Sequence, residues 1–405
     1  MTAGGAATGV APEDLGAERL ARAHLSRVVE PGDKALSRLL GEHGPVALAS
    51  RVRSGAVPDR WVVRARALDV PTPRMVEAAR RRGIRVVVPS DLDWPDGLSD
   101  LDHEAGGVAC LWVRGQTPPP ASGAIGVVGA RDASPYGEGV AAGLAADLVT
   151  SGWTVVSGAA LGIDAAAHRG ALAGAGPGAA GGDRGAVPTV AVLGCGVDRA
   201  YPSSHAGLLD RIVSAGGGVV AELPPGSSPY PWRFPARNRV IAALSRGVVV
   251  VEAGARSGAV GTARSADDLS RVVMAVPGPA HASRSVGCHD LLRAGASLVT
   301  SVADVHALVG RLSPAETPEP EEASGRAGGS ADGPGDGVST GWAQRVARCL
   351  SAGRERTTDD VAAVAGLDPA DARSALLDLE AAGLARRTVG GWRRAATSRS
   401  PRRRV

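Results

Sequence analysis

Short valine-rich runs alternate with alanine-rich segments from Ala124 to about Val309, and this alternation restricts the fold more than any other feature of the chain. The runs are continuously apolar, which is typical of strands buried on both faces of a parallel sheet. Strands that alternate with helices predict right-handed βαβ units, and therefore an α/β fold with a doubly wound, mostly parallel sheet. We expect strands at Ala124–Gly129, Trp153–Ser157, Thr189–Leu193, Val219–Glu222, Val248–Glu252 and Val272–Val276. We expect helices at Gly139–Val149, Ala165–Ala173, Ser204–Ala215, Arg237–Leu244 and Thr262–Asp268.

The segments before this region have a different pattern. Residues 1–11 are small and weakly patterned, and we expect them to be disordered. Residues 12–122 begin with leucines near helical spacing and continue with strand-like runs at Ile84 and Cys110. They predict a small N-terminal helical domain, of SAM/HhH-like type, and its connection to the α/β domain at 123–312.

The segments after the α/β domain also differ from it. Residues 313–340 carry many acids, prolines and glycines, and this composition predicts a linker that cannot bury enough apolar surface to order. Residues 341–395 show the order helix, helix, helix, strand, glycine turn, strand, which predicts a winged helix-turn-helix. Residues 396–405 form a basic tail.

Composition excludes several classes of protein. The only lysine, Lys34, does not stand in the Gly-Lys-[Ser/Thr] context of a P-loop, so that class of ATPase is excluded. The four cysteines form no Cys-x-x-Cys pair, which argues against common zinc modules and against a disulfide framework. A reduced, cytoplasmic compartment is the simplest expectation. We expect no membrane span, because the sequence has no apolar run of about 18 residues. We expect no signal peptide, because the N-terminus is not a basic segment followed by an apolar run.

The charge of the chain is uneven. The formal net charge is +4, and six arginines and no acid fall between Gly391 and Val405. Two interpretations of this end remain open: it binds a polyanion, or it is a solvated basic tail without a partner.

Glycines and arginines follow the expected strands, at the edge where ligands of parallel sheets bind. Glycine turns bring backbone amides close to an anion, and a forked guanidinium suits phosphate. We expect the guanidiniums of Arg131, Arg237 and Arg239 to converge on one rim. Asn238, between two arginines, favours a phosphate or base contact. For Tyr201 and Phe234, stacking on a base and packing against the sheet remain equally open.

Other chemistry is not favoured at these turns. The spacing Gly-x-Gly-x-x-Gly is absent at Gly126–Gly129, which argues against a dinucleotide site, and Ser157 is not in a Gly-x-Ser-x-Gly elbow. Asp164 and His168 lie one helical turn apart without a third ligand, so a structural hydrogen bond is favoured over a metal. We predict no catalytic residue, no metal and no cofactor.

Six motifs in order carry a family resemblance. VVGARDASPYG, SGAALGIDAAAH, TVAVLGCGVDRAYP, FPARNRVIAALS, VVEAGARSGAVGTA and VMAVPG closely resemble the DNA-processing DprA (Smf) family over about residues 124–305. WPDGL and CLWVRG, within 12–122, resemble it more loosely. The resemblance implies a Rossmann-like domain that binds single-stranded DNA without catalysis. It also implies protection of incoming strands in natural transformation, loading of the RecA recombinase, and a homodimer.

The resemblance also implies which residues bind DNA. Its motifs transfer a DNA-binding role to Arg131, Ser157, Gly158, Gly162, Arg237, Asn238, Arg239, Ser257, Gly258 and Thr262. Relatives commonly place a lysine after the Tyr-Pro pair, where this chain has Ser203, Ser204 and His205. Arg199 or Arg211 could replace that lysine.

Two other functions compete with this hypothesis. Rossmann-like nucleotide hydrolases related to the cytokinin-activating "lonely guy" proteins carry a glutamate where this chain has Ser265, which argues against hydrolysis. Alternatively, the predicted winged helix makes the protein a regulator that binds duplex DNA.

Overall fold

The computed structural model describes residues 12–101, 106–176, 187–310, 346, 349–350, 355–365, 369–381, 384–388 and 391–394. The expected disordered start, the acidic linker and the basic tail lie outside the described residues. The chain divides into two compact units, Met1–Leu312 and Ser313–Val405. The predicted domain boundaries otherwise stay predictions.

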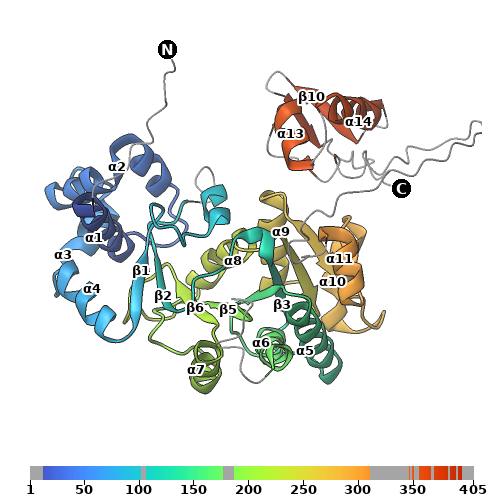
Figure 1. The fold of residues 1–405 in the computed structure, drawn as a ribbon, viewed down its shortest axis with the longest axis horizontal. Coiled ribbons are helices and arrows are strands. Elements are labelled where there is room, and N and C mark those ends of the chain that lie inside the picture. Colours follow the sequence, from blue (N-terminus) through green and yellow to red (C-terminus); the bar gives the residue numbers. More distant parts are fainter. Residues whose placement is uncertain are drawn as a thin grey trace, which may run out of the picture. The chain divides into compact units, whose positions relative to one another are not determined.

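The first unit is built on a nine-stranded sheet with the strand order β1-β2-β6-β5-β4-β3-β7-β8-β9 (Figure 1). β3 lies between β4 and β7 and pairs with both in parallel, so the chain winds outward from β3 in two directions. This arrangement confirms the α/β class and the mostly parallel, doubly wound sheet. The strands are β1 (Ile84–Val87), β2 (Leu111–Gly115), β3 (Ala124–Gly129), β4 (Thr154–Ser157), β5 (Thr189–Val192), β6 (Gly218–Ala221), β7 (Gly247–Val251), β8 (Val272–Ala275) and β9 (Ser297–Leu298).

The first two strands precede the expected start of the α/β domain at residue 123 and nevertheless belong to its sheet. β2 pairs antiparallel with β6, with Trp112 opposite Ala221, and β1 pairs antiparallel with β2. The sheet therefore extends across the boundary that we placed between residues 122 and 123. The separate helical part ends before Ile84.

Helices cover both faces of the sheet. One face packs against α8 (Arg233–Ala243), α9 (Gly258–Asp268) and α10 (Val286–Arg293). The opposite face packs against α5 (Pro135–Thr150), α6 (Ile163–Ala175), α7 (Ala206–Ser214) and α11 (Val302–Val309). Short 3-10 segments lie at Asp96–Leu101, Ala121–Gly123, Ser203–His205 and Ser283–Ser285.

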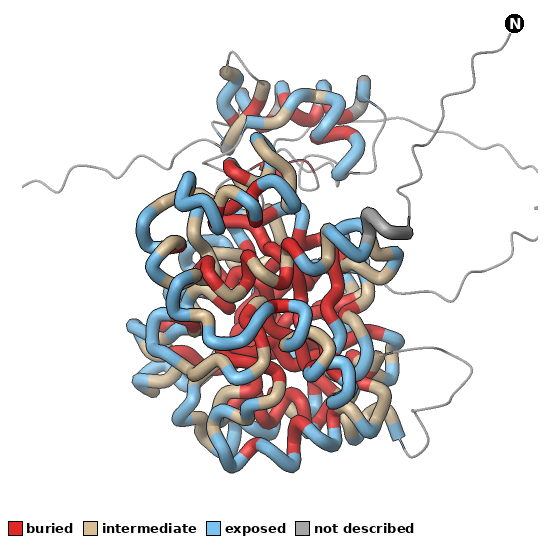
Figure 2. The backbone as a smooth tube through the Cα atoms, turned by 90° about the vertical axis from the view of Figure 1, so that its left-hand side faces the viewer, coloured by how far each residue is buried: buried red, intermediate tan, exposed pale blue. Residues whose placement is uncertain are grey.

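The core is aliphatic because the chain offers few aromatic residues. Valines of the central strands, such as Val127, Val156 and Val249, are fully buried between the helix layers. Figure 2 shows the buried residues gathered in the middle of the first unit. Continuous burial explains why these strands are apolar on both faces.

A helical part precedes the sheet and consists of α1 (Pro12–Val28), α2 (Ala35–Ser54), α3 (Asp59–Arg66) and α4 (Thr72–Arg81). Its own core contains Leu25, Leu48 and Trp61, and Pro45 lies at a kink inside α2. The Trp61 indole N–H donates to Asp33 over 2.8 Å, which satisfies its only polar atom.

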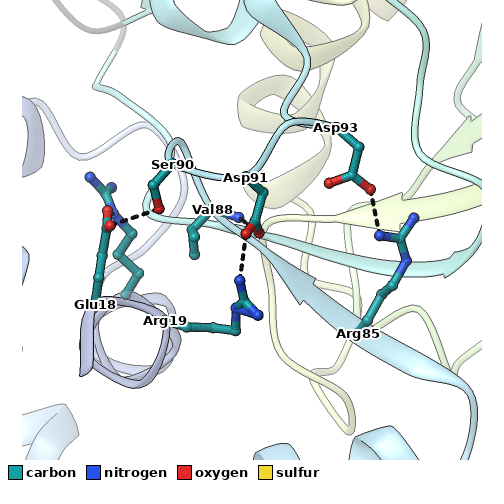
Figure 3. A network of polar contacts seen from close by, with 8 residues as sticks. Glu18, Arg19, Arg85, Val88, Ser90, Asp91 and Asp93 are labelled. Atoms are coloured by element: carbon teal, nitrogen blue, oxygen red, sulfur yellow. Dashed lines mark hydrogen bonds and ion pairs between the residues drawn. The ribbon is translucent and has the colours of Figure 1, made fainter. Parts of the chain in front are cut away.

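A polar network joins α1 to the loop after β1 (Figure 3). Arg19 pairs with Asp91, and the Ser90 hydroxyl donates to Glu18 over 2.8 Å. The backbone N–H of Val88 donates to Asp91 over 2.9 Å, so the same carboxylate also holds the loop. The helical part is thereby attached to the edge of the sheet.

The second unit contains α13 (Thr358–Ala365), α14 (Pro369–Ala381), β10 (Ala385–Thr388) and β11 (Gly391–Arg394). The two strands pair antiparallel, and Trp392 is buried among apolar side chains of the helices. Most of the first predicted helix of this unit lies outside the described residues, so the winged helix-turn-helix stays a prediction. No helix of the described residues is long and apolar enough to cross a membrane.

Candidate nucleic-acid interface

The carboxyl ends of the parallel strands form one edge of the sheet, where the loops after β3 and β7 diverge. Ligands of doubly wound folds bind at such a divergence. The turns and arginines expected from the sequence follow β3, β4, β6 and β7. Most of them lie at this edge, but they differ in which atoms remain available for a ligand.

Aromatic side chains gather at this edge. The chain has only three tyrosines and one phenylalanine, and all four follow strands at their carboxyl ends. Tyr136, Tyr201 and Tyr230 are 50%, 46% and 43% exposed. Exposed rings on one edge provide faces for stacking on unpaired bases.

Arg131 contacts this aromatic group from the loop after β3. Its guanidinium lies 5.3 Å from the centre of the Phe234 ring. The Phe234 ring in turn lies 5.3 Å from that of Tyr201. Arg131 is exposed, and no carboxylate of the described residues forms an ion pair with it. We call Arg131, Tyr201 and Phe234 the Arg131 cluster. They come from the loop after β3, the loop after β5 and the first turn of α8, which are distant in sequence.

Arg237 does not lie on the expected rim. It is 6% exposed, and its guanidinium donates to the backbone oxygen of Val192 over 2.7 Å. Burial lowers the pKa of Arg237, and the nearby Asp164 carboxylate opposes that shift. Its side chain is therefore part of the interior beneath the turn after β4.

Arg239 is also buried, in place of the exposed position that we expected. It is 6% exposed and donates to the Glu222 carboxylate over 2.6 Å. Burial raises the pKa of Glu222, against the attraction of Arg239. This pair links α8 to the residue after β6, and in this conformation its buried guanidinium is not available to a phosphate.

The turn after β4 is satisfied internally. The backbone N–H groups of Gly158 and Ala160 donate to Asp164 over 3.1 and 3.2 Å. The Ser157 hydroxyl donates to the backbone oxygen of Val127 over 2.7 Å and is fully buried. Gly162, with a φ of 71°, is the N-cap residue before α6, which begins at Ile163. These residues shape the turn, and the carboxylate of Asp164 takes the position that an anionic ligand would occupy.

The turn after β7 is a helix start. Ser257 caps α9 by accepting from the backbone N–H of Ala259, and Thr262 is 1% exposed. The Asn238 amide donates to the backbone oxygen of Gly258 over 3.2 Å. Asn238 therefore links α8 to α9, and Gly258 remains exposed at the edge.

Glu252 is a further residue of this edge, and our sequence analysis assigned it no role. It directly follows β7, has a φ of 54°, and accepts from both the backbone N–H and the hydroxyl of Ser134. Ser134 caps α5, so a carboxylate lies at that helix N-terminus. The signal was an acid directly after a buried valine strand.

Asp164 and His168 are not partners. His168 bonds to the Thr189 hydroxyl over 2.7 Å, and burial lowers its pKa to about 3, so the imidazole is neutral. Within the described ranges no group of three potential metal ligands occurs. Each of the two residues thus has a structural hydrogen-bond role.

Comparisons with known proteins agree with this fold. The profile of the DNA recombination-mediator protein A family matches residues 85–310, from β1 to the end of α11. A Mycobacterium tuberculosis protein named as a candidate DNA processing protein DprA is 41% identical over 384 residues, covering 92% of this chain and 93% of the relative. The chain belongs to this family. The resemblance to DprA (Smf) is confirmed.

One further relative matches this chain both in sequence and in structure. The DNA processing protein DprA of Streptococcus pneumoniae is 43% identical over 185 residues, 45% of this chain and 60% of the relative. The X-ray structure of DprA from the same organism covers 72% of this chain and 97% of its own, with a TM-score of 0.56 and 29% identity. The likeness in fold thus covers more of this chain than the family profile, which matches residues 85–310.

Proposed function

We propose that this protein binds single-stranded DNA along the carboxyl edge of its sheet, and that it acts in DNA processing and recombination. The Arg131 cluster carries this proposal: an exposed guanidinium, which pairs with no carboxylate of the described residues, lies over the half-buried Phe234 ring and near the exposed Tyr201 ring. Single-strand binding needs a cation for the backbone and flat faces for the bases, without a catalytic acid or base.

The occupied helix N-termini support a polymer ligand over a nucleotide. In nucleotide-binding α/β proteins, phosphate lies on the backbone amides of a strand-to-helix turn. Here Glu252 holds the start of α5, and Asp164 holds the amides after β4. A nucleotide hydrolase would need that space for phosphate, so we propose binding without catalysis.

Arg199 is our choice for the missing lysine contact. It is exposed in the same loop as Tyr201, whereas Arg211 lies on α7, further from the edge. Within the described residues its guanidinium makes one hydrogen bond, to the backbone oxygen of Gly226, and this bond is long at 3.4 Å. The guanidinium can exchange that bond for a phosphate.

Family membership extends the proposal beyond DNA binding. DprA-like function implies protection of incoming strands in natural transformation and transfer of those strands to the RecA recombinase. It also implies a homodimer and a cytoplasmic location. These parts of the proposal rest on the family and on no geometry of the Arg131 cluster.

A salt titration tests the interface. Binding of a labelled, unstructured oligonucleotide is measured between about 50 and 200 mM salt for the wild type and for Arg131→Ala. The substitution is expected to reduce the log–log salt slope by roughly 0.7 and to weaken all sequences alike, because one phosphate contact is lost.

The matched control is Arg246→Ala. Arg246 is exposed but precedes β7, at the opposite edge of the sheet. Its removal should leave the slope unchanged. Equal slopes for the wild type and Arg131→Ala, or equal losses for both variants, would contradict the proposed interface.

A further inference from the structure

A second aromatic group lies beside the Arg131 cluster. Tyr230 and Trp232 stack with ring centres 4.7 Å apart and planes inclined by only 3°. Trp232 is 59% exposed, which is unusual for a ring of this size. Only one residue separates Trp232 from Phe234 of the Arg131 cluster, so the two groups adjoin along the same edge.

Arg233 supports this stack from the interior. Its guanidinium lies 4.9 Å from the centre of the Tyr230 ring. It is only 6% exposed and donates to the backbone oxygen of Ser228 over 2.7 Å. Arg233 is therefore a support for the tyrosine and is not placed to contact a phosphate.

The helical part fixes Arg233. Glu30, just after α1, accepts two bonds from Arg233, over 3.0 and 2.8 Å. The same carboxylate pairs with Arg64 of α3. A forked guanidinium held by both oxygens of a carboxylate has a fixed orientation, so the helical part orients the guanidinium that lies against the Tyr230 ring.

We propose that the Tyr230–Trp232 stack is a second binding site for an unpaired base, and that Glu30 is its positioning residue. This inference rests on the proposed function. A base is the occupant that fits: the rings of the stack are already parallel, the outer ring is exposed, and Trp232 lies two positions before Phe234 of the Arg131 cluster. A preformed platform loses little conformational entropy when a flat ring joins it.

Removal of the exposed ring is the first test. Affinities for fluorescein-labelled oligothymidylates of about 5 and about 15 nucleotides, within the range of single-strand site sizes, are measured for the wild type, Trp232→Ala and Trp232→Phe. Trp232→Ala should weaken the longer oligonucleotide about 5- to 150-fold, the range of one base–aromatic stack. Its salt slope should not change, because no charge is lost, and Trp232→Phe should recover most of the affinity.

Glu30→Gln gives a test whose sign is decisive. Loss of an acid from a protein that binds a polyanion should by charge alone strengthen binding. If Glu30 positions the stack, Glu30→Gln instead weakens binding of the longer oligonucleotide. The matched control is Glu42→Gln, which removes a carboxylate that pairs with Arg38 on α2 and does not contact Arg233. This control should bind as tightly as the wild type or slightly more tightly.

The outcomes separate the two proposals. A wild type that binds neither oligonucleotide overturns the proposed function and this inference together. If the wild type binds, and Trp232→Ala binds both oligonucleotides as tightly as the wild type, only the inference is overturned. The exposed stack would then be a contact surface for a protein partner. If Glu30→Gln and Glu42→Gln bind with the same affinity, the positioning role of Glu30 is overturned. Thermal unfolding checks that both variants are folded.

Discussion

Arg237 shows at the scale of one residue how the same sequence signal fits two environments. An arginine beside an asparagine suggested a phosphate contact, yet the side chain is buried. The helical spacing contained the missing information. Arg237 shares a face of α8 with Val240, Ile241 and Leu244, all of them buried. A residue on that stripe faces the sheet whatever its charge.

For the aromatic residues the error was an omission: exposed side chains at the edge were not predicted to bind. Tyr230, Trp232 and Phe234 fall within five positions of a chain that is only 3% aromatic. That density was a signal, but only Phe234 entered our expectations. Whether such rings pack inward or stay exposed depends on the tertiary environment, here the support of Arg233 and Glu30.

Gly158 gives a prediction at this scale. A Cβ atom at that position would lie 1.6 Å from a guanidinium nitrogen of Arg237, so Gly158→Ala must displace a buried charged group. We expect a loss of about 3 kcal/mol in the free energy of unfolding, measured in urea. Gly261→Ala is the control, because nothing lies within 4 Å of its Cβ and alanine favours the helix α9. The control should be neutral or stabilising, and equal stabilities of the two variants would contradict our account of the turn.

At the scale of elements, strands were more predictable than helix ends. All six expected strands are present within about one residue, since a valine run buried on both faces has one obvious extent. Four of the five expected helices begin earlier than expected, whereas α7 begins two residues later, at Ala206. α5 begins at Pro135 after the Ser134 cap, and α8 begins at Arg233, ahead of Pro235. Proline is compatible with a first helical turn, and we had placed both starts after it.

The carboxylates of the helical part give a pH prediction. Burial alone would raise the pKa of Asp33, but hydrogen bonds from Arg60 and Trp61 outweigh it and lower that pKa. The same balance holds for Glu30, where Arg233 and Arg64 lower the pKa. A depressed folded pKa means that the stabilisation is complete above the unfolded value of about 4 and is lost as the pH falls through the folded value.

Hydrogen exchange of α1–α3 as a function of pH tests this point. Protection corrected for intrinsic exchange should fall below about pH 4 in the wild type, and Asp33→Asn should reduce that dependence. Asp59→Asn, at the exposed start of α3, should retain it. Identical profiles for both variants would show that Asp33 does not hold this part.

At the scale of the whole molecule, the proposed binding surface belongs to one unit. The Arg131 cluster, the Tyr230–Trp232 stack and the helical part all lie within Met1–Leu312. A protein truncated after Leu312 should therefore keep the wild-type preference for single-stranded over double-stranded oligonucleotides in a competition assay. Loss of single-strand binding by the folded truncated protein would instead support the second unit as the main DNA-binding element.

The sequence predicted the class of the sheet but not the order of its strands. Strand and helix alternation indicated a doubly wound sheet, but it did not indicate that β2 would add to β6 and extend the sheet across a predicted domain boundary. Nor did it reveal the two-residue β9, which is too short to leave a pattern. Such edge strands are defined by their neighbours.

Glu252 has a consequence for selectivity inside a cell. Nucleoside triphosphates are abundant there, and any vacant phosphate cradle would fill with them. This protein closes the cradle at α5 with a side chain of its own. Under our proposal a single nucleotide therefore lacks a phosphate site at the start of α5, whereas a long strand can make many weak contacts along the rim. We accordingly expect the protein to bind DNA in preference to the nucleotides from which DNA is built.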